Sequence, residues 1–267
     1  MDLLAAGLLV MAGLGAGFLD GVFTVGSGVV LVPVLLLYCH ASGVSSLVAT
    51  HVAMGTSLLV VAFSSAARTR EYARTGHCLR REAAYLGIAG AAGSVIGAAV
   101  ASGLEGTTLT RIFGFVILVT AVRLFGGKRK SAAEREPDSA PWPLVGGGSL
   151  IGFVSALSGG GGAPLAVPFL YTYRKFPLKK AIGTSGAAIV LMAAAGAAVY
   201  LLRGWGNEFL PPGMPGFISW QAALPLIAGV IPGVILGTRA ASRADVPFLR
   251  TGFAVLLLAV MLRMLFL

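Results

Sequence analysis

The sequence predicts an all-α integral membrane protein with two inverted repeats, each a broken, re-entrant helical hairpin followed by three transmembrane helices. Three observations predict this fold: a very apolar composition, a glycine motif that occurs once in each half, and basic residues that gather in short loops. Of the 267 residues, 57% are hydrophobic and only 11% are charged, and the mean hydropathy is +0.89. So little charge in a chain of this length excludes an ordinary soluble domain and indicates a polytopic membrane protein.

The glycine motif interrupts two long apolar segments, residues 1–39 and 144–173. Its matched residues are 135 positions apart: Gly17-Phe18 with Gly152-Phe153, Gly26-Ser27-Gly28 with Gly161-Gly162-Ala163, and Pro33 with Pro168. Further matches follow in the same order: Gly55-Thr56-Ser57 with Gly183-Thr184-Ser185, and Gly93 and Gly97 with Gly233 and Gly237. This shared order indicates a duplicated chain, and broken helices in corresponding positions point to a transporter binding site.

Three apolar spans follow each broken segment, near residues 45–66, 83–103 and 109–126, and near residues 182–202, 220–239 and 247–266. Each has about 20 residues, enough at about 1.5 Å per residue to cross roughly 30 Å of hydrocarbon. Residues 128–143 are charged and contain proline, which is typical of a linker. We therefore expect a first membrane repeat at residues 1–127, a cytoplasmic linker at residues 128–143 and a second membrane repeat at residues 144–267, forming one transport domain.

Basic residues gather in four loops: Arg68, Arg70, Arg74, Arg80 and Arg81; Lys128, Arg129, Lys130 and Arg135; Arg174, Lys175, Lys179 and Lys180; and Arg239, Arg243 and Arg250. The positive-inside rule places these loops in the cytoplasm and both chain termini outside. The net charge of +10 then reports orientation rather than a nucleic-acid partner. Residues 144–173 must return to the side from which they enter, which favours a re-entrant hairpin. Two full crossings per broken segment give the same sidedness and remain an alternative.

The glycine breaks have the chemistry of an anion site. Residues 159–162 are four glycines, and Pro164 suits the first turn of a helix, so one helix should begin near Ala163 and a second near Gly28. The free N–H groups and positive dipole of a helix start attract anions. The candidate binding residues are Gly26, Ser27, Gly28, Gly160, Gly161, Gly162 and Ala163, with hydroxyl donors Thr56, Ser57, Thr184 and Ser185. Alternatively, the glycines serve close helix packing and the hydroxyls bond their own backbone.

Two ionisable residues in the apolar segments, Asp20 and His51, are candidates for proton coupling. Asp20 lies six residues before Gly26, and its repeat partner is Ser155, so only one half carries the acid. A carboxyl group removed from water holds a proton more readily, although Asp20 could instead cap the broken helix or bond nearby amides. His51 could titrate near physiological pH or be satisfied at an interface. No spacing of ligands suggests a metal or a cofactor.

The breaks and their flanks resemble the sulfite exporter TauE/SafE family. The pattern of that family is a GxGGG run, four apolar residues and proline, repeated in the second half, and residues 159–168 follow it most closely. Thr24 and Ser27 stand where the family usually has glycine, and Ala163 replaces the last glycine. The resemblance covers nearly the whole chain. It implies a multi-pass permease of the bacterial-type inner membrane that exports sulfite or related organosulfonates.

These features favour a secondary transporter that exports sulfite or a small organosulfonate, with the anion held between the two helix starts. No nucleotide-binding motif is present, which argues against direct ATP hydrolysis. The alternatives within transport are a small-anion channel and a permease for thiosulfate or sulfate. An intramembrane enzyme would need convergent Asp, Glu, His or Cys residues, and an assembly subunit would not need two symmetric breaks. The expected partners are the substrate and the lipid bilayer, with proton coupling and the oligomeric state left open.

Overall fold

The computed structural model describes residues 3–126, 140–211 and 214–241, and every regular element in these ranges is a helix. In chain order the elements are α1 (Leu3–Phe23), α2 (Gly28–Ala41), α3 (Ser46–Arg74), α4 (Arg80–Ala101), α5 (Gly106–Gly126), α6 (Pro141–Ser158), α7 (Ala163–Pro168), the π-helix η1 (Phe169–Tyr173), α8 (Leu178–Arg203) and α9 (Trp220–Ala241). Five of these helices (α1, α3, α4, α8 and α9) are long and apolar enough to cross a membrane. The prediction of an all-α membrane protein is confirmed.

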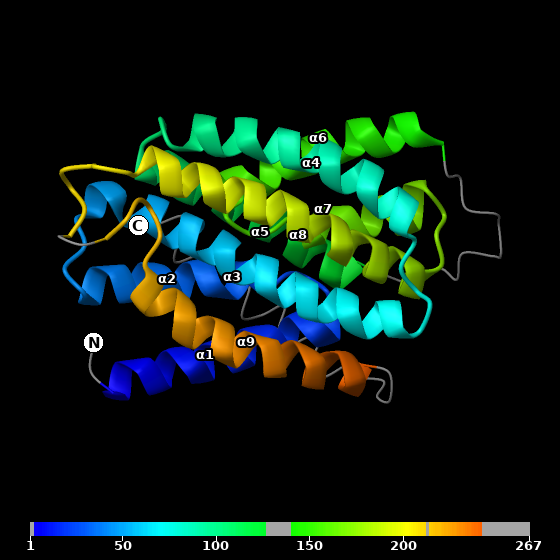
Figure 1. Ribbon diagram of the computed structural model, residues 1–267, viewed down its shortest axis with the longest axis horizontal. Coiled ribbons are helices and arrows are strands. Elements are labelled where there is room, and N and C mark those ends of the chain that lie inside the picture. The colour runs from blue at the N-terminus through cyan, green and yellow to red at the C-terminus, as the bar shows by residue number, and fades with distance from the viewer. Residues whose placement is uncertain (1–2, 127–139, 212–213, 242–267) are drawn as a thin grey trace.

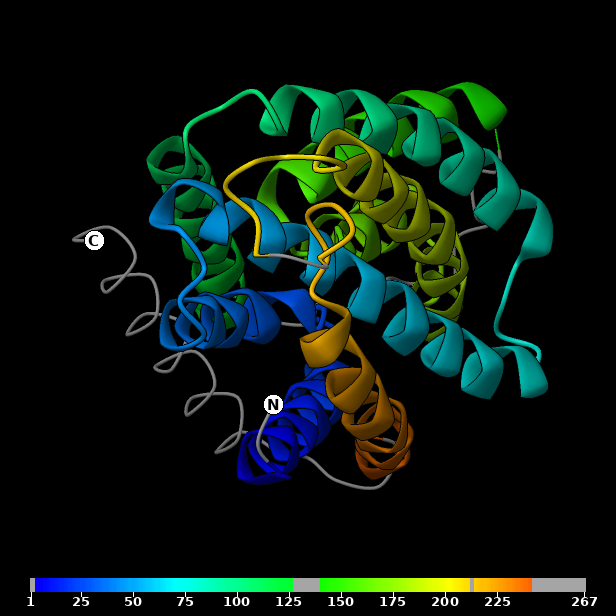
Figure 2. The same ribbon diagram turned by 60° about the vertical axis from the view of Figure 1, so that its left-hand side comes forward.

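The helices run along one axis, with α1 and α9 at one edge of the bundle and α4 and α6 at the other (Figures 1 and 2). Helices α3 and α8 lie between these edges. The burial of α3 identifies it as central, because 78% of its most apolar stretch is buried, compared with 28% for α1. The site residues carried by α3 are therefore held away from the surrounding lipid.

Close helix packing at the two edges follows the same pattern. Gly13 of α1 lies against the backbone of Leu226 on α9, and Gly148 of α6 lies against the backbone of Leu86 on α4. A Cβ atom at either glycine would stand 2.5 Å from the facing carbonyl oxygen. Gly148 comes 135 positions after Gly13, and Leu226 comes 140 positions after Leu86, so the two contacts are repeat equivalents. The first arm of each broken segment thus packs on a helix of the other half.

Two hydrogen bonds between the halves also correspond. The Thr56 hydroxyl accepts a hydrogen bond from the Ser219 backbone N–H at 2.9 Å, at the start of α9. The Thr184 hydroxyl accepts one from the Leu79 N–H at 3.1 Å, at the start of α4. Thr184 matches Thr56 and Ser219 matches Leu79 in the repeat. Each half therefore supplies a hydroxyl that satisfies a backbone donor at a helix start in the other half.

Each broken segment has a long arm and a short arm. Helix α1 has 21 residues, about 31 Å at 1.5 Å per residue, which is enough to cross a bilayer core, whereas α2 has only 14 residues. In the second segment, α6 has 18 residues and α7 continues as a short π-helix. In Figure 1 the start of α1 and the end of α2 lie at the same end of the molecule. Their orientation in a membrane stays a prediction.

One predicted boundary is wrong in a way that matters for the site. The span expected at residues 45–66 continues as helix α3 to Arg74, so Arg68, Arg70 and Arg74 lie on a helix rather than in a loop. The reason is local: residues 66–74 contain neither glycine nor proline, and alanine and arginine favour helix. Helix α6 begins at Pro141, whereas most of the predicted linker and the whole span at residues 247–266 lie outside the described residues.

Candidate functional site

The two glycine breaks, residues 24–27 and residues 159–162, meet in the interior of the protein. A Cβ atom at Gly26 would stand 3.0 Å from the Gly160 carbonyl oxygen, and one at Gly28 would stand 2.8 Å from the Gly159 carbonyl oxygen. The backbones of the breaks are therefore in direct contact, from opposite halves of the chain. In this arrangement no space remains between the two breaks for an oxyanion.

Both breaks use left-handed backbone at matching positions. Gly26 has φ +90° and Gly161 has φ +80°, while Thr24 has φ +57° where its repeat partner Gly159 has φ +62°. A β-branched residue in this region is a true outlier and costs on the order of 1–3 kcal/mol. At position 24 the first break therefore has the left-handed backbone of its repeat partner, although threonine stands there in place of glycine.

The two helices expected after the breaks begin where the sequence predicts. Helix α2 begins at Gly28 and α7 begins at Ala163 with Pro164 in its first turn. The α-helical part of α7 ends after six residues, and η1 continues it to Tyr173. The α-helix that follows the second break, α7 with 6 residues, is consequently shorter than α2, which has 14.

The first break is tied to a buried ion pair. Asp20 is 2% exposed, and its Oδ1 atom accepts a hydrogen bond from the Gly26 backbone N–H at 2.9 Å. Arg68 of α3 donates through Nη1 to the same Oδ1 atom and is itself buried. The Ser64 hydroxyl lies 3.4 Å from Asp20 Oδ2 and shares a hydrogen bond of 2.9 Å with the Ser27 hydroxyl. A carboxylate, a guanidinium, two hydroxyls and a backbone amide thus form one network.

Arg68 was not among the predicted site residues, because the charge pattern assigned it to a cytoplasmic loop as an orientation signal. Of the two interpretations of Asp20, the bond to a nearby amide is what the structure contains, and an arginine from another helix accompanies it. A usable signal was present: Arg68 follows Ser64 by four residues with no glycine or proline between them. On a continuous helix, residues four apart share a face, so the basic residue should have been expected beside Ser64.

The second break is held by serines. The Ser57 hydroxyl donates to the Gly159 carbonyl oxygen at 2.9 Å, and the Gly160 N–H donates to the Ser158 hydroxyl at 3.3 Å. Ser155, the repeat partner of Asp20, is buried and its hydroxyl has no hydrogen-bond partner. The asymmetry expected from the sequence therefore has a physical form: an ion pair braces one break, and neutral hydroxyls lie along the other.

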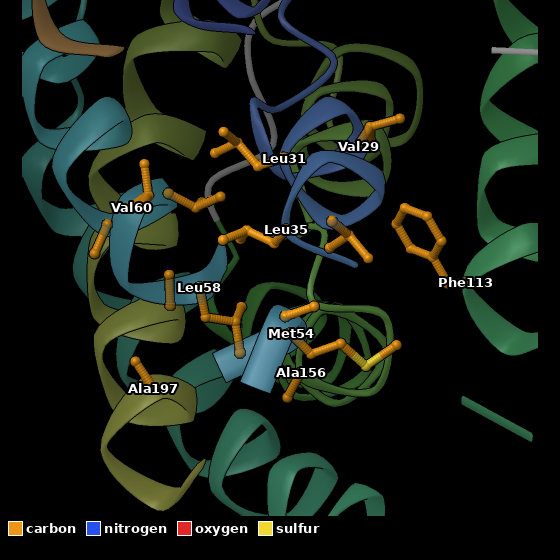
Figure 3. Packing of buried hydrophobic residues seen from close by; sticks show 14 of the residues in the cluster. Val29, Leu31, Leu35, Met54, Leu58, Val60, Phe113, Ala156 and Ala197 are labelled. Atoms are coloured by element: carbon orange, nitrogen blue, oxygen red, sulfur yellow. The ribbon is translucent and has the colours of Figure 1, made fainter. Parts of the chain in front are cut away.

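A small pocket opens beside the second break. Its polar lining comes from Ser155, Ser158 and the break itself at Gly160 and Gly162. Its apolar lining comes from α2, α5, α6 and α7 and includes Val29 and Phe113. In Figure 3, the Phe113 ring of α5 points toward α2, close to Val29. The wall of this pocket is almost entirely apolar, and Ser155, Ser158 and the glycine backbone contribute only a small part of it.

The other predicted hydroxyl donors have partners elsewhere. The Thr56 and Thr184 hydroxyls accept hydrogen bonds from the starts of α9 and α4. The Ser185 hydroxyl donates to the Ile182 carbonyl oxygen in its own helix at 3.0 Å. Of the four, Ser57 is thus the residue whose hydroxyl bonds to a break. The alternative interpretation, that the hydroxyls bond their own backbone, describes Ser185, whereas Thr56, Ser57 and Thr184 bond backbone groups of other segments.

His51 lies apart from the Asp20 network. Its Nε2 atom is 3.0 Å from the Leu104 carbonyl oxygen, and its ring packs on Phe217 with centroids 5.2 Å apart. His51 precedes Ser64 by 13 residues on α3, about 20 Å along the helix axis. These contacts place His51 at an interface between helices, although its Nδ1 atom is buried and has no hydrogen-bond partner. Within the described ranges, no group of three or more His, Cys, Asp or Glu residues is arranged to hold a metal ion.

Comparison with known proteins places this architecture in a family. Residues 9–264 match the family described as sulfite exporter TauE/SafE. The chain is 28% identical to a probable membrane transporter protein of Haemophilus influenzae, over 96% of this chain and 97% of that protein. It is also 28% identical to the probable membrane transporter protein YunE of Bacillus subtilis, over 86% of each chain. No solved structure matches the chain significantly. Because the match spans nearly its whole length, the chain belongs to the sulfite exporter TauE/SafE family and is a membrane transporter, not an enzyme.

Proposed function

We propose that this protein is a secondary transporter that exports sulfite or a small organosulfonate across the cytoplasmic membrane, with the anion bound at the glycine breaks. The observation that carries the proposal is the contact between the two breaks inside the protein. Non-helical backbone at membrane depth is tolerated only where protein buries it or where it lines a watery cavity. Two such segments from corresponding positions are therefore expected to serve the substrate path.

The chemistry around the second break suits a small oxyanion. Gly160 and Gly162 allow an oxygen atom to approach the backbone closely, and the Ser155 hydroxyl is an unused donor on the same pocket wall. The lining from Val29 and Phe113 is apolar, so the glycine backbone and the Ser155 hydroxyl are the groups left to bind an anion there. The family description names sulfite, a small oxyanion that such donors can bind.

Transport through this site requires the breaks to part. The Gly26–Gly160 and Gly28–Gly159 contacts close the route between the halves, so the structure corresponds to an occluded arrangement. Movement of one half relative to the other would open the site to each side in turn, as in other transporters built from repeats. A membrane potential or an ion gradient would supply the energy.

Adding a methyl group at Gly160 tests this proposal. The backbone there is not left-handed, and the nearest atom to a new Cβ is the Ser158 hydroxyl oxygen at 3.3 Å, so Gly160→Ala should fold while narrowing the pocket. Gly146→Ala is the matched control, because Gly146 lies on α6 with nothing within 4 Å of a new Cβ. We expect sulfite flux into proteoliposomes to fall about tenfold or more in Gly160→Ala, in line with the loss of closely fitted contacts, and to be unchanged in Gly146→Ala.

Three outcomes separate the alternatives. Equal flux in both variants and the wild type would remove the second break from the substrate path. Flux without counterflow would indicate a channel in place of a carrier. Competition by thiosulfate or sulfate that exceeds competition by sulfite would assign a different sulfur oxyanion.

A further inference from the structure

The hydrogen-bond donors around Asp20 are of the kinds that bind an oxyanion. The Gly26 N–H donates to Oδ1 at 2.9 Å, the Arg68 guanidinium donates to the same atom, and the Ser64 hydroxyl lies 3.4 Å from Oδ2. All are buried, with Arg68 1% and Ser64 0% exposed. Backbone amides, hydroxyls and arginine are the groups that bind carboxylate, sulfonate and sulfite oxygens alike. The carboxylate of Asp20 therefore occupies a position that an exogenous oxyanion would also fit.

Arg68 has more hydrogen-bonding capacity than its partners use. Its Nε atom is buried and has no partner, and Nη2 makes only a long contact of 3.4 Å to the Ser65 hydroxyl. An unpaired buried donor of a charged group is costly. A purely structural ion pair is expected to satisfy these donors, as buried polar groups generally are. Asp20 thus uses only part of the hydrogen-bonding capacity of Arg68, which an oxyanion with three acceptor oxygens could use more fully.

We propose that Arg68 binds the transported oxyanion, and that Asp20 holds this place on Arg68 while no anion is bound. This inference rests on the proposed function and adds a cationic binding residue to it. The anion and the Asp20 carboxylate compete for one guanidinium, so they do not occupy it together. In the absence of substrate, the Asp20 carboxylate is the anionic partner of Arg68.

The competition couples anion binding to the first break. The Oδ1 atom that pairs with Arg68 also accepts the Gly26 N–H, and Gly26 is in contact with Gly160 across the two breaks. When an anion takes the place of the carboxylate, the hydrogen bond that ties the Gly26 amide to Asp20 of α1 is lost, and the contact that closes the breaks is weakened. Binding of substrate thereby favours separation of the two halves.

Charge balance limits what binds together with the anion. Asp20 and Arg68 carry one negative and one positive charge, so a monovalent anion added to the pair leaves an excess of one negative charge. Within the described residues, the groups that contact Asp20 are Arg68 and Ser64 from α3 and the Gly26 N–H, and Ser27 contacts Ser64. Glu71 of α3 and Arg239 of α9 form a separate ion pair, with Arg239 Nε 3.5 Å from Glu71 Oε2. One compensating cation should therefore bind with each monovalent anion.

Sulfite binding to the purified protein, measured alongside thermal melting, tests the inference. Asp20→Asn keeps a carbonyl acceptor for Gly26 but removes the competing charge. We expect this variant to melt at a lower temperature without anion, to regain stability with sulfite, and to bind sulfite about tenfold more tightly than the wild type.

Removal of the guanidinium gives the converse result. Arg68→Gln should lose sulfite binding, whereas Arg70→Gln, which removes an exposed charge from the same helix, should bind as the wild type does. If Arg68→Gln does not fold, the double variant Asp20→Asn with Arg68→Gln retains a neutral hydrogen-bonded pair and should fold without binding sulfite. Sulfite binding retained by the double variant, or weakened by Asp20→Asn as much as by Arg68→Gln, overturns the inference.

These results remain distinct from a failure of the proposed function. If the wild-type protein binds and transports sulfite but is indifferent to Arg68, the transporter proposal stands and the anion lies elsewhere. If the wild type neither binds nor transports any sulfur oxyanion, the proposed function itself fails.

Discussion

At the scale of single residues, Asp20 and Arg68 alter the chemistry expected of this chain. The sequence offered a buried acid as a proton carrier, and the structure pairs it with an arginine that the charge pattern assigned to a loop. The ion pair is buried on both sides, so breaking it by removing one partner should destabilise the protein strongly. A residue counted as an orientation signal thus becomes part of the candidate site.

Thr24 provides a prediction at the same scale. Its φ of +57° is unfavourable for a β-branched side chain, and its repeat partner is Gly159. Thr24→Gly should therefore raise the free energy of unfolding by roughly 0.5–1 kcal/mol, because relief of strain outweighs the added backbone entropy of glycine. Thr24→Val, which retains the strain, is the control. Thermal melting in detergent measures both, and a loss of stability in Thr24→Gly would show that the hydroxyl stabilises the break.

At the scale of elements, the halves are joined by reciprocal contacts rather than packed as separate bundles. Helix α1 packs on α9 and α6 packs on α4 through equivalent glycines. Each threonine of the Gly-Thr-Ser motif accepts a backbone hydrogen bond at the start of a helix in the other half. The motif that the sequence assigned to substrate hydroxyls therefore contributes mainly to the junction of the repeats.

The two threonine contacts predict equal and independent losses of stability when either hydroxyl is removed. Thr56→Val and Thr184→Val keep the side-chain volume and remove the acceptor, and each should cost about 1 kcal/mol of stability, as the loss of a helix-start acceptor does. The double variant should lose about the sum, because the two contacts share no residue. Ser185→Ala, whose hydroxyl bonds its own helix, is the control and should change little. A much larger effect of one threonine than of the other would contradict the symmetric assignment.

At the scale of the whole molecule, the loop charges predict the orientation of the protein in the membrane. Cys39 is fully buried, so the native cysteines do not give a balanced labelling pair. In a Cys78→Ser background, Ser42→Cys and Thr75→Cys place thiols at exposed positions after α2 and after α3. We expect a membrane-impermeant maleimide to label position 42 in intact cells and position 75 only after permeabilisation. Labelling of both in intact cells would contradict the predicted orientation.

The sequence by itself determined the class, the duplication and the positions of both helix breaks. Composition limits the chain to the membrane, and glycine runs followed by proline act locally on the backbone, so Gly28 and Ala163 could be named as helix starts without knowledge of any neighbour. The resemblance carried by the same residues also indicated the family that the comparison confirms.

Only the tertiary structure decided which polar groups meet. Arg68 is 48 positions from Asp20, and Ser219 is 163 positions from Thr56, and hydrogen bonds of this kind leave no periodic trace in a single sequence. The glycine breaks touch because α1 and α6 pack on helices of the opposite halves, a consequence of the whole arrangement. The duplicated break is thus local in origin, whereas the buried charge beside one copy depends on how far α3 extends and which face it turns inward.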